Sequence, residues 1–565
     1  MSRREAWFSA AAVLLVALAV RVAAAAVVRF PIPEDTAYYA GVARNLVEGR
    51  GLISDALWSY QTQPLVVPRA AFEVWLPLPS LLAAVPMAVA GAANWFRAAQ
   101  VISIAASSIV AVLAWRLGAD VAAEMAMPVG RARSVGIGTG LVAAVLGPLV
   151  IYGALPDSTA IFAALSLAAC LLMTRLAAHE EVAAENERGR RHVPDQRRQQ
   201  GWRRQQSWRL VVLGRLFGFA ALTRSEAAWL GLAWAAVAWF WTPGSRRRRI
   251  GLVAVPAVIG ILVVLPWVVR DWVAFGTPLP GQTISNALFV HSYDVFAYGD
   301  PPTLAGYLAQ GPAALAGMHM AGIAHDLFAV LLIPAFPVGL VGLLVLPWVG
   351  RRRSLRPLAL VAALTFLITS LAFPIATQSG TFLHAAGSTF VLLTVCCAVA
   401  LDGLIVRIGR LRHWTNPVSW LGPAFAIAAV VPLCLVSVSS VAGQADEVSA
   451  RYDALPAAMA RAGVALDGVS PVITDNPIWL AESARIPTLA LPEESPDSVL
   501  VLARHFGAKL LVVRTETDSE WPGILRQGGA AARCFQEIPI SGNPDGGPDE
   551  VAVLATIHVF RIVCS

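Results

Sequence analysis

Long apolar segments alternate with short polar ones over the first part of the chain, residues 1–441. A helix needs roughly 20 apolar residues to cross the hydrocarbon core of a bilayer. We count about eleven segments that fit this pattern when shorter paired segments are included. They cover residues 7–30, 98–117, 135–155, 158–176, 210–222, 227–241, 250–269, 327–349, 358–373, 388–405 and 420–441. The pattern therefore predicts a polytopic α-helical membrane protein.

The hydropathy pattern changes at residue 442. Short apolar runs rich in β-branched residues then alternate with helical patterns towards the C-terminus. This alternation is typical of a small α/β domain. The sequence thus predicts a transmembrane domain over residues 1–441 and an α/β domain over residues 442–565. Cys534 and Cys564 lie in the second domain and could form a disulfide if that domain is exported.

The loops between the predicted spans indicate which side of the membrane each one faces. Arg3 and Arg4 precede the first span. If the chain crosses the membrane at each predicted span in turn, every loop on the same side as these two arginines is basic. The positive-inside rule then predicts a cytoplasmic N-terminus and an extracytoplasmic α/β domain in a multi-pass protein of the plasma (inner) membrane. This threading leaves two long external loops, residues 31–97 and 270–325. Within the first, the proline-containing apolar stretch 76–91 is predicted to lie along the membrane surface.

Composition supports the membrane assignment and limits the classes of partner. The chain is 57% hydrophobic and 14% charged, and its mean hydropathy is +0.63. Its net charge of +7 is carried almost wholly by arginine. Loop arginines beside anionic headgroups account for that charge. We therefore expect the lipid bilayer as a partner and no nucleic acid.

The first external loop begins with a group of polar residues at the membrane surface. Glu34 and Asp35 follow directly after the prolines that end the first span. A short helix is predicted next, in which Tyr38 and Tyr39 share a face with Asp35 and Arg44 lies further on. Paired carboxylates beside an apolar groove suit general-base catalysis, because a desolvated carboxylate can take the proton of an attacking alcohol. We predict Asp35 and Glu34 as catalytic residues and the other three as substrate-binding residues.

Three further acids fall on the same side of the predicted membrane. These are Glu73 in the first external loop, Asp157 after the third span and Glu226 between the fifth and sixth. Ionisable groups near the hydrocarbon are costly, so each needs a physical reason. We predict that they bind the acceptor or the donor. The alternative is interfacial capping, since Asp157 could cap a helix that starts at Ser158.

Four basic side chains accompany these acids. A guanidinium at the interface can hold a phosphate through two hydrogen bonds. We predict Arg69, Arg224, Arg270 and His384 as residues that bind a lipid phosphate. Two alternatives stay open: Arg224 and Arg270 could simply snorkel to the surface, and His384 could be a packed interfacial histidine.

The order and placement of these motifs resemble the GT-C membrane glycosyltransferases. The resemblance is to the branch that holds the protein O-mannosyltransferases, the lipid A aminoarabinose transferases and their bacterial dolichyl-phosphate-mannose-type relatives. It covers roughly residues 1–440, and it rests on PEDTAYYAGVARNLVEGRG, FEVWLPLPSLL, ALPDSTAIFAAL, GFAALTRSEAAWL and RDWVAFGTPLP. Each motif is loose alone, while their order is more specific.

The resemblance implies a GT-C fold and the transfer of a hexose or pentose from a polyprenyl-phosphate sugar, with inversion. The acceptor would be a hydroxyl of a glycan, a lipid or a protein. Asp35 would be the general base, and Glu73 and Asp157 would shape the acceptor and donor site. Arg270, together with Arg224 or His384, would hold the lipid phosphate leaving group.

Two departures from the family pattern concern phosphate and metal binding. Val74 stands where the lipid A branch often has a basic residue, and Asp271 stands where an asparagine is commoner. The oligosaccharyltransferase relatives use an Asp-x-Asp pair and a divalent metal, and this chain has no equally clear pair. We therefore predict no metal site and no certain cofactor, and a divalent metal stays an open alternative.

Two other function classes compete with the enzyme. A transporter or flippase of lipid-linked sugars would have related sequence halves and charges near the bilayer midplane. The sequence shows no internal repeat, and its acids cluster towards one face. A non-catalytic membrane protein that presents an external binding domain is the third class. The glycosyltransferase is the favoured hypothesis, and the role of the α/β domain stays open between acceptor recognition and covering the groove.

Overall fold

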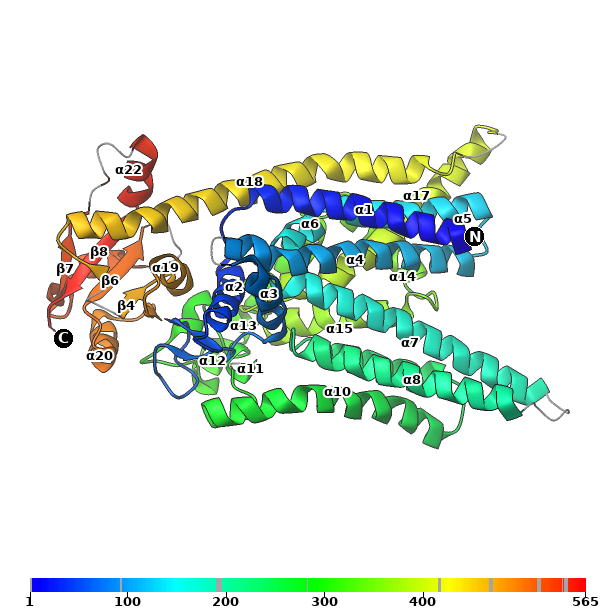
Figure 1. Ribbon diagram of the computed structural model, residues 1–565, viewed down its shortest axis with the longest axis horizontal. Helices are drawn as coiled ribbons and strands as arrows, with labels where there is room; N and C mark the ends of the chain where they lie inside the picture. Colours follow the sequence, from blue (N-terminus) through cyan, green and yellow to red (C-terminus); the bar gives the residue numbers. More distant parts are fainter. Residues whose placement is uncertain are drawn as a thin grey trace.

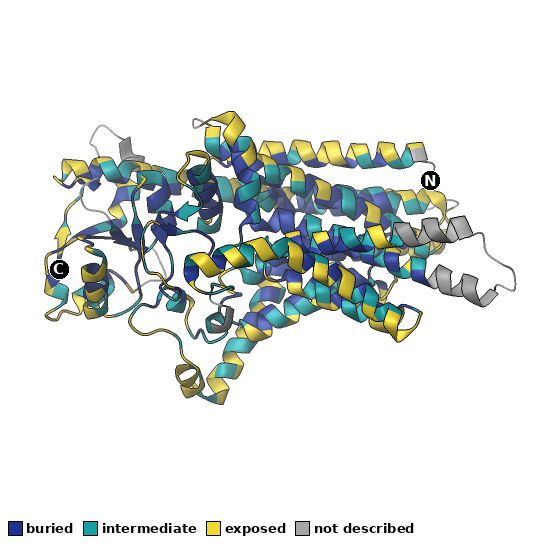
Figure 2. Cartoon of the chain, turned by 60° about the horizontal axis from the view of Figure 1, so that its bottom comes forward, coloured by how far each residue is buried: buried dark blue, intermediate teal, exposed yellow. Residues whose placement is uncertain are grey.

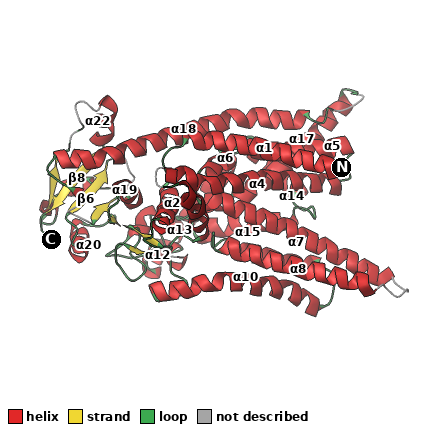
Figure 3. Ribbon diagram, in the orientation of Figure 1, coloured by secondary structure: helices red, strands yellow, loops and turns green. Residues whose placement is uncertain are grey.

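The computed structural model describes residues 3–91, 94–189, 196–281, 283–414, 418–466, 471–515, 520–540, 542 and 547–564. The chain forms a bundle of long helices with an α/β domain at one end and the N-terminus at the other (Figure 1). The strands of the described residues gather at the end that holds the α/β domain (Figure 3). The predicted fold class, a polytopic helical membrane protein with a C-terminal α/β domain, is confirmed.

The helices of the bundle and its loops are as follows. They are α1 (Arg3–Val27), α2 (Glu34–Val47), α3 (Leu78–Ala90), α4 (Trp95–Glu124), α5 (Val129–Val145), α6 (Gly147–Ala154), α7 (Ser158–Gly189), α8 (Gln196–Ala221), α9 (Ala227–Ala236), η2 (Val237–Trp241), α10 (Arg246–Phe275), α11 (Thr283–Asn286), η3 (Ser292–Phe296), α12 (Leu304–Ala309), α13 (Gly311–Ala324), η4 (His325–Leu332), α14 (Val338–Val349), α15 (Arg356–Ala372), α16 (Thr381–Ala385), α17 (Gly387–Leu411) and α18 (Leu421–Arg461).

The number of qualifying spans is smaller than the sequence predicts. Among the described residues, seven helices are long and apolar enough to cross a membrane, or eight if the bent pair α5 and α6 is one span. The difference arises because α9, α14 and α15 are apolar but short. In α8, only the part from about residue 210 onwards is apolar. Conversely, Gly311–Leu332 qualifies as a span, although most of it falls in the predicted external loop 270–325.

The core of the bundle lies around α17. In this helix 72% of the most apolar window is buried, against 17% in both α10 and α18. Figure 2 shows the same contrast, with buried residues in the interior of the bundle and exposed ones along the outer helices. α16 directly precedes α17, so His384, which is buried, lies at one end of this central helix.

The bend between α5 and α6, which measures 54°, is held by a buried arginine that the sequence analysis did not single out. Pro148 has no amide hydrogen for the carbonyl of Ala144, four residues earlier. The guanidinium of Arg21, from the middle of α1, donates to the carbonyls of Ala144 at 2.8 Å and Ala143 at 3.2 Å. It also donates to Ser107 Oγ at 2.7 Å. The guanidinium thus gives the carbonyl of Ala144 the hydrogen-bond donor that Pro148 lacks.

The strands of the described residues belong to the predicted first external loop, residues 31–97, and to the α/β domain. They are β1 (Ile53–Ser54), β2 (Ala56–Leu57), β3 (Arg69–Ala70), β4 (Val472–Thr474), β5 (Thr488–Ala490), β6 (Leu510–Arg514), β7 (Phe535–Ile538) and β8 (Ile557–Ile562). The remaining helices of the domain are α19 (Pro477–Ala484), α20 (Pro496–Phe506), α21 (Gly523–Arg526), η6 (Ala532–Cys534) and α22 (Gly547–Ala555).

The main sheet joins the two predicted domains. Within the described residues this sheet has six strands in the order β2-β5-β4-β6-β8-β7, so its edge strand β2 comes from the predicted first external loop. β2 pairs in parallel with β5, with Ala56 opposite Thr488. α18 also continues from the bundle into the domain as one helix of 41 residues. Cys534 and Cys564 form a disulfide within the domain.

Candidate active site at the domain end of the bundle

α2 carries most of the residues predicted for the reaction centre. Pro33 precedes its first turn, and Asp35 and Tyr39 lie four residues apart on one face. Burial raises the pKa of Tyr39 well above its ordinary value, although the nearby Arg224 opposes this shift. Tyr39 is therefore a neutral hydroxyl beside Asp35, and its hydroxyl interacts with Ser158.

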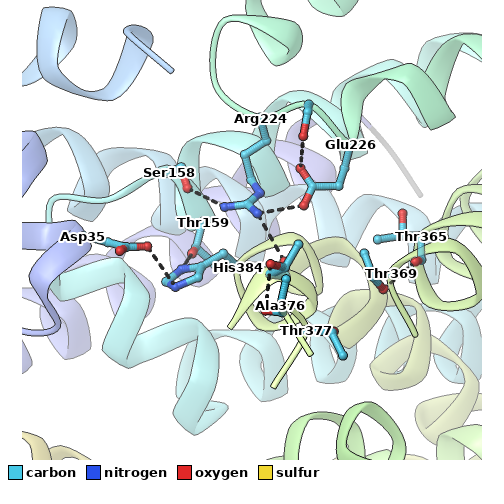
Figure 4. A network of polar contacts seen from close by, with 12 residues as sticks. Asp35, Ser158, Thr159, Arg224, Glu226, Thr365, Thr369, Ala376, Thr377 and His384 are labelled. Atoms are coloured by element: carbon cyan, nitrogen blue, oxygen red, sulfur yellow. Dashed lines mark hydrogen bonds and ion pairs between the residues drawn. The ribbon is translucent and has the colours of Figure 1, made fainter. Parts of the chain in front are cut away.

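A histidine lies between two of the predicted carboxylates, and Figure 4 shows its contact with one of them, Asp35. His384 Nε2 lies 3.5 Å from Asp35 Oδ2, and Nδ1 lies 3.3 Å from Asp157 Oδ2. Nδ1 also lies 2.9 Å from the hydroxyl of Thr159. The Asp157 side chain is fully buried, whereas 30% of the Asp35 side chain is exposed. Of these two aspartates, Asp35 is thus the one that a substrate can reach.

Asp157 also has the capping role that the sequence left as an alternative. Its Oδ1 accepts a hydrogen bond of 2.7 Å from the backbone N–H of Thr159, in the first turn of α7. The same carboxylate faces His384 through Oδ2. The side chain of Asp157 therefore caps α7 and contacts His384 at the same time, because the start of α7 lies next to α16.

Arg224 and Glu226 complete this group at the turn between α8 and α9. Arg224 forms an ion pair of 2.7 Å with Glu226 and donates to Ser158 Oγ at 3.1 Å and to the carbonyl of Thr381 at 3.2 Å. Its Nε is buried and has no partner within the described part of the chain. The Asp35 network, as we call it, consists of Asp35, Tyr39, Asp157, Ser158, Thr159, Arg224, Glu226 and His384.

A second polar group lies on the Tyr38 side of α2. Arg69 and Glu73 form a buried ion pair of 2.5 Å. Arg270 pairs with Asp271 at 2.8 Å and donates to the carbonyl of Ala71 at 2.7 Å. Tyr38 accepts a hydrogen bond of 2.6 Å from the backbone N–H of Phe72. We call Tyr38, Arg69, Glu73, Arg270 and Asp271 the Arg69 group.

The remaining two predicted residues face the α/β domain. Glu34 Oε1 accepts hydrogen bonds from the backbone N–H groups of Ile478 at 3.1 Å and Trp479 at 3.4 Å. Arg44 forms an ion pair of 2.7 Å with Glu482. The structure thus divides the predicted site among three places, and the Asp35 network contains six of the twelve predicted residues.

Sequence reasoning missed several members of the network. Ser158 and Thr159 follow Asp157 directly, and this Asp-Ser-Thr sequence at a helix start was the available signal. Tyr152 was also missed, although its ring packs 5.2 Å from that of His384. Thr381 contributes only a backbone carbonyl, so no side-chain pattern could have indicated it.

The geometry does not fit a metal held by these carboxylates. Among the described residues, no group of three or more His, Cys, Asp and Glu side chains could hold a metal ion. Asp35 and Asp157 lie on opposite sides of the imidazole of His384. The two carboxylates therefore contact the ring and do not point towards a common metal position.

The fold itself has relatives of known structure. An apo oligosaccharyltransferase from Archaeoglobus fulgidus matches with a TM-score of 0.52 and 13% identity, over 95% of this chain and 73% of that chain. An oligosaccharyltransferase from the same organism, in complex with an inhibitory peptide and a dolichol-phosphate, matches with a TM-score of 0.50 and 12% identity, over 97% and 75%. The chain has the GT-C fold.

At these identities the likeness concerns the GT-C fold alone. ArnT from Cupriavidus metallidurans, in the apo state, also matches, with a TM-score of 0.48 and 15% identity over 100% of this chain and 99% of that chain. No family model matches the sequence, and no curated protein matches it by sequence. The function therefore has to be argued from the site.

Proposed function

We propose that the protein is a membrane glycosyltransferase that moves a monosaccharide from a polyprenyl-phosphate sugar to an acceptor hydroxyl on the extracytoplasmic face. The observation that carries this proposal is the partly exposed Asp35, which lies 3.5 Å from a histidine that a second, buried aspartate contacts. The GT-C fold supports the class of reaction, and one protein with this fold was solved with a dolichol-phosphate and a peptide.

Asp35 acts as the general base in this proposal. It takes the proton of the acceptor hydroxyl as that oxygen attacks the anomeric carbon of the sugar. The new bond forms on the face opposite to the phosphate, the bond from carbon to phosphate oxygen breaks, and the configuration inverts. His384 orients the carboxylate, and Asp157 and Thr159 hold the imidazole in turn.

Arg224 stabilises the departing lipid phosphate in this proposal, because both ring nitrogens of His384 already face Asp35, Asp157 and Thr159. Arg224 comes from a different part of the chain than Asp35 but belongs to the same network, and the two charges attract each other. The unpartnered Nε of Arg224 leaves one donor for a phosphate oxygen, and a fixed donor placed where charge develops lowers the barrier. Arg270, of which 23% of the side chain is exposed, is a second candidate for the phosphate or the acceptor.

Replacing Asp35 with asparagine tests the proposal. Membranes that contain the protein would be incubated with radiolabelled undecaprenyl-phosphate mannose, arabinose or aminoarabinose, and transfer to envelope glycans, lipids and proteins would be measured. We expect Asp35→Asn to reduce transfer by about 10²–10⁴-fold, the usual contribution of a general base. Asp497→Asn, on the exposed surface of α20, is the matched control and should leave transfer unchanged.

Two outcomes would count against this function. Full transfer by Asp35→Asn would remove Asp35 from the role of base. Transfer from none of the three donors by the unchanged protein would count against a polyprenyl-phosphate sugar as the substrate. Mass spectrometry of cell-envelope glycans with and without the gene would identify the sugar and the acceptor.

A further inference from the structure

The first turn of α2, which carries Asp35, lacks a capping side chain of its own. Pro33 occupies the N-cap position, and no side chain there accepts a hydrogen bond from the helix. The first N–H groups of a helix have no partner within it, and such ends fray unless something holds them. A catalytic carboxylate in this turn therefore needs support from another part of the protein.

α19 of the α/β domain supplies this support from two sides. The backbone N–H groups at its start donate to Glu34, the residue before Asp35. The indole Nε1 of Trp479 donates to the carbonyl of Pro31 at 3.0 Å, just before α2. These contacts join residues more than 440 positions apart in the chain. The segment that leads into α2 is thereby fixed at both ends by one short helix.

The rest of α2 is shaped to receive α19 closely. A Cβ built on Gly41 would lie 2.7 Å from Glu482 Oε2, so a larger residue there would displace the carboxylate of Glu482. One turn later, Arg44 pairs with Glu482 and donates to its carbonyl at 3.2 Å. The contact therefore runs along α2, and Figure 1 shows α19 beside α2 at the end of the bundle.

We propose that the α/β domain positions the general base, because α19 binds Glu34 and thereby holds the first turn of α2 with Asp35 facing His384. Glu34 is then a positioning residue rather than the second catalytic acid that the sequence predicts. This inference rests on the proposed function, since it takes Asp35 as the base. It also gives the domain a role that is neither acceptor recognition nor a passive cover.

The directions of the two side chains support this division of roles. Consecutive residues on an α-helix point about 100° apart, because the helix has about 3.6 residues per turn. Glu34 faces the domain and Asp35 faces the bundle from the same turn. A rotation of that turn would therefore move both carboxylates together. Displacing a catalytic group by about 1 Å can cost about 10²-fold in rate.

The test compares alanine and glutamine at position 34. Burial raises the pKa of Glu34 to about 8, so glutamine copies the shape and the acceptor oxygen of its largely protonated form. We expect Glu34→Ala to lower kcat by about 10- to 100-fold with an unchanged KM for the donor. Glu34→Gln should stay within about twofold of the unchanged protein. The full-length protein in nanodiscs would be assayed with whichever of the three radiolabelled donors gives transfer.

A second variant and a matched control address the domain contact itself. Trp479→Phe keeps an aromatic ring but removes the N–H that donates to the carbonyl of Pro31, and it should lower kcat, as Glu34→Ala does. Arg485→Ala removes an exposed ion pair to Glu48 at the other end of α2, and it should leave kcat unchanged. Equal losses of kcat in Trp479→Phe and Arg485→Ala would mean that any contact between α2 and the α/β domain matters. That result would overturn a specific role for the first turn of α2.

Hydrogen exchange provides a readout that needs no donor. Glu34→Ala should speed amide exchange in the first turn of α2, while Glu34→Gln should not. If Glu34→Ala leaves both kcat and this exchange unchanged while Asp35→Asn abolishes transfer, the positioning role is wrong and the proposed function stands. If glutamine lowers kcat as much as alanine does, Glu34 takes part in the chemistry. If the unchanged protein shows no transfer but Glu34→Ala speeds exchange, the proposed function fails and the contact is structural.

Discussion

The two polar groups on either side of α2 are built in different ways. The Asp35 network collects side chains from α2, the start of α7, the turn after α8 and α16. In the Arg69 group, Arg69 and Glu73 are four residues apart, and Arg270 and Asp271 are neighbours. The Arg69–Glu73 pair is almost fully buried, so these two charges leave little for a substrate. The network instead leaves Asp35 partly exposed, which is the property that a base needs.

The largest effect that separates the two groups is expected at His384. His384→Ala should reduce glycosyl transfer by about 10³-fold, because Asp35 loses the ring that orients it. The protein should keep its thermal stability in detergent. His558→Ala, at a partly exposed position on β8 of the α/β domain, is the control. Unchanged transfer by His384→Ala would remove the distinction between the network and the Arg69 group.

The second expected effect is on stability and concerns Glu73. Glu73→Ala should lower the free energy of unfolding by about 3 kcal/mol, because it leaves the buried Arg69 without its partner. Thermal unfolding in detergent would measure this, and the double variant Arg69→Met with Glu73→Leu should recover much of the loss. A fall in kcat at full stability would instead place Glu73 in the substrate site, as the sequence predicts.

The two groups differ in how far the sequence alone predicts them. The alternation of spans and basic loops was sufficient to expect Asp35, Asp157 and Glu226 on one side, and the structure brings them together. It was not sufficient to separate Glu73 from them, because topology gives the side of the membrane but not which neighbour a side chain faces. Local pairing of Arg69 with Glu73 was the missing information.

Long-range contacts made by short elements lay beyond the sequence pattern. β2 has two residues, which is too short for a detectable alternation, yet it joins the main sheet. The contact of Glu34 with α19 depends on backbone N–H groups, which every sequence offers. Arg21 is a single charge in a long apolar helix, and its role depends on a proline in another helix. The number of helices that qualify as spans by length differs from the sequence count for a related reason, since short apolar helices such as α14 and α15 also pack into the bundle.

A third prediction concerns pH and the contact of α2 with the α/β domain. The pKa of Glu34 is raised from 4.5 to about 8, chiefly by burial and further by Asp475, while its hydrogen bonds to α19 and the charge of Arg514 oppose the shift. The folded state therefore holds this proton at pH values where the unfolded chain has lost it. The stability that Glu34 contributes is full below about pH 4.5 and is lost as the pH rises to about 8.

Hydrogen exchange in α19 between pH 5 and pH 8 would measure this dependence after correction for the intrinsic exchange rate. Protection should fall with rising pH in the unchanged protein and should lose this slope in Glu34→Gln. A slope that survives in Glu34→Gln would assign the titration to another group. Glu482 is the alternative, because burial raises its pKa to about 7.

The smallest effect is expected for an exposed pair that belongs to neither group. Arg116 and Asp120 form an ion pair one turn apart on α4, and 44% of the Arg116 side chain is exposed. Arg116→Ala should change the free energy of unfolding by no more than about 0.5 kcal/mol. Thermal unfolding beside Glu73→Ala would check it. A loss as large as that of Glu73→Ala would show that burial does not set the contribution of ion pairs in this protein.

The length of α18 has a mechanical consequence. Its 41 residues, at about 1.5 Å each, make a rod of about 60 Å, roughly twice the thickness of the hydrocarbon core. One part of α18 lies in the helix bundle and the other part packs against the α/β domain, so the two parts tilt together. A tilt that a thicker or thinner bilayer imposes on the first part would therefore move the second part, and with it α19, which contacts α2. We therefore expect the length of the lipid chains to affect the alignment of Asp35.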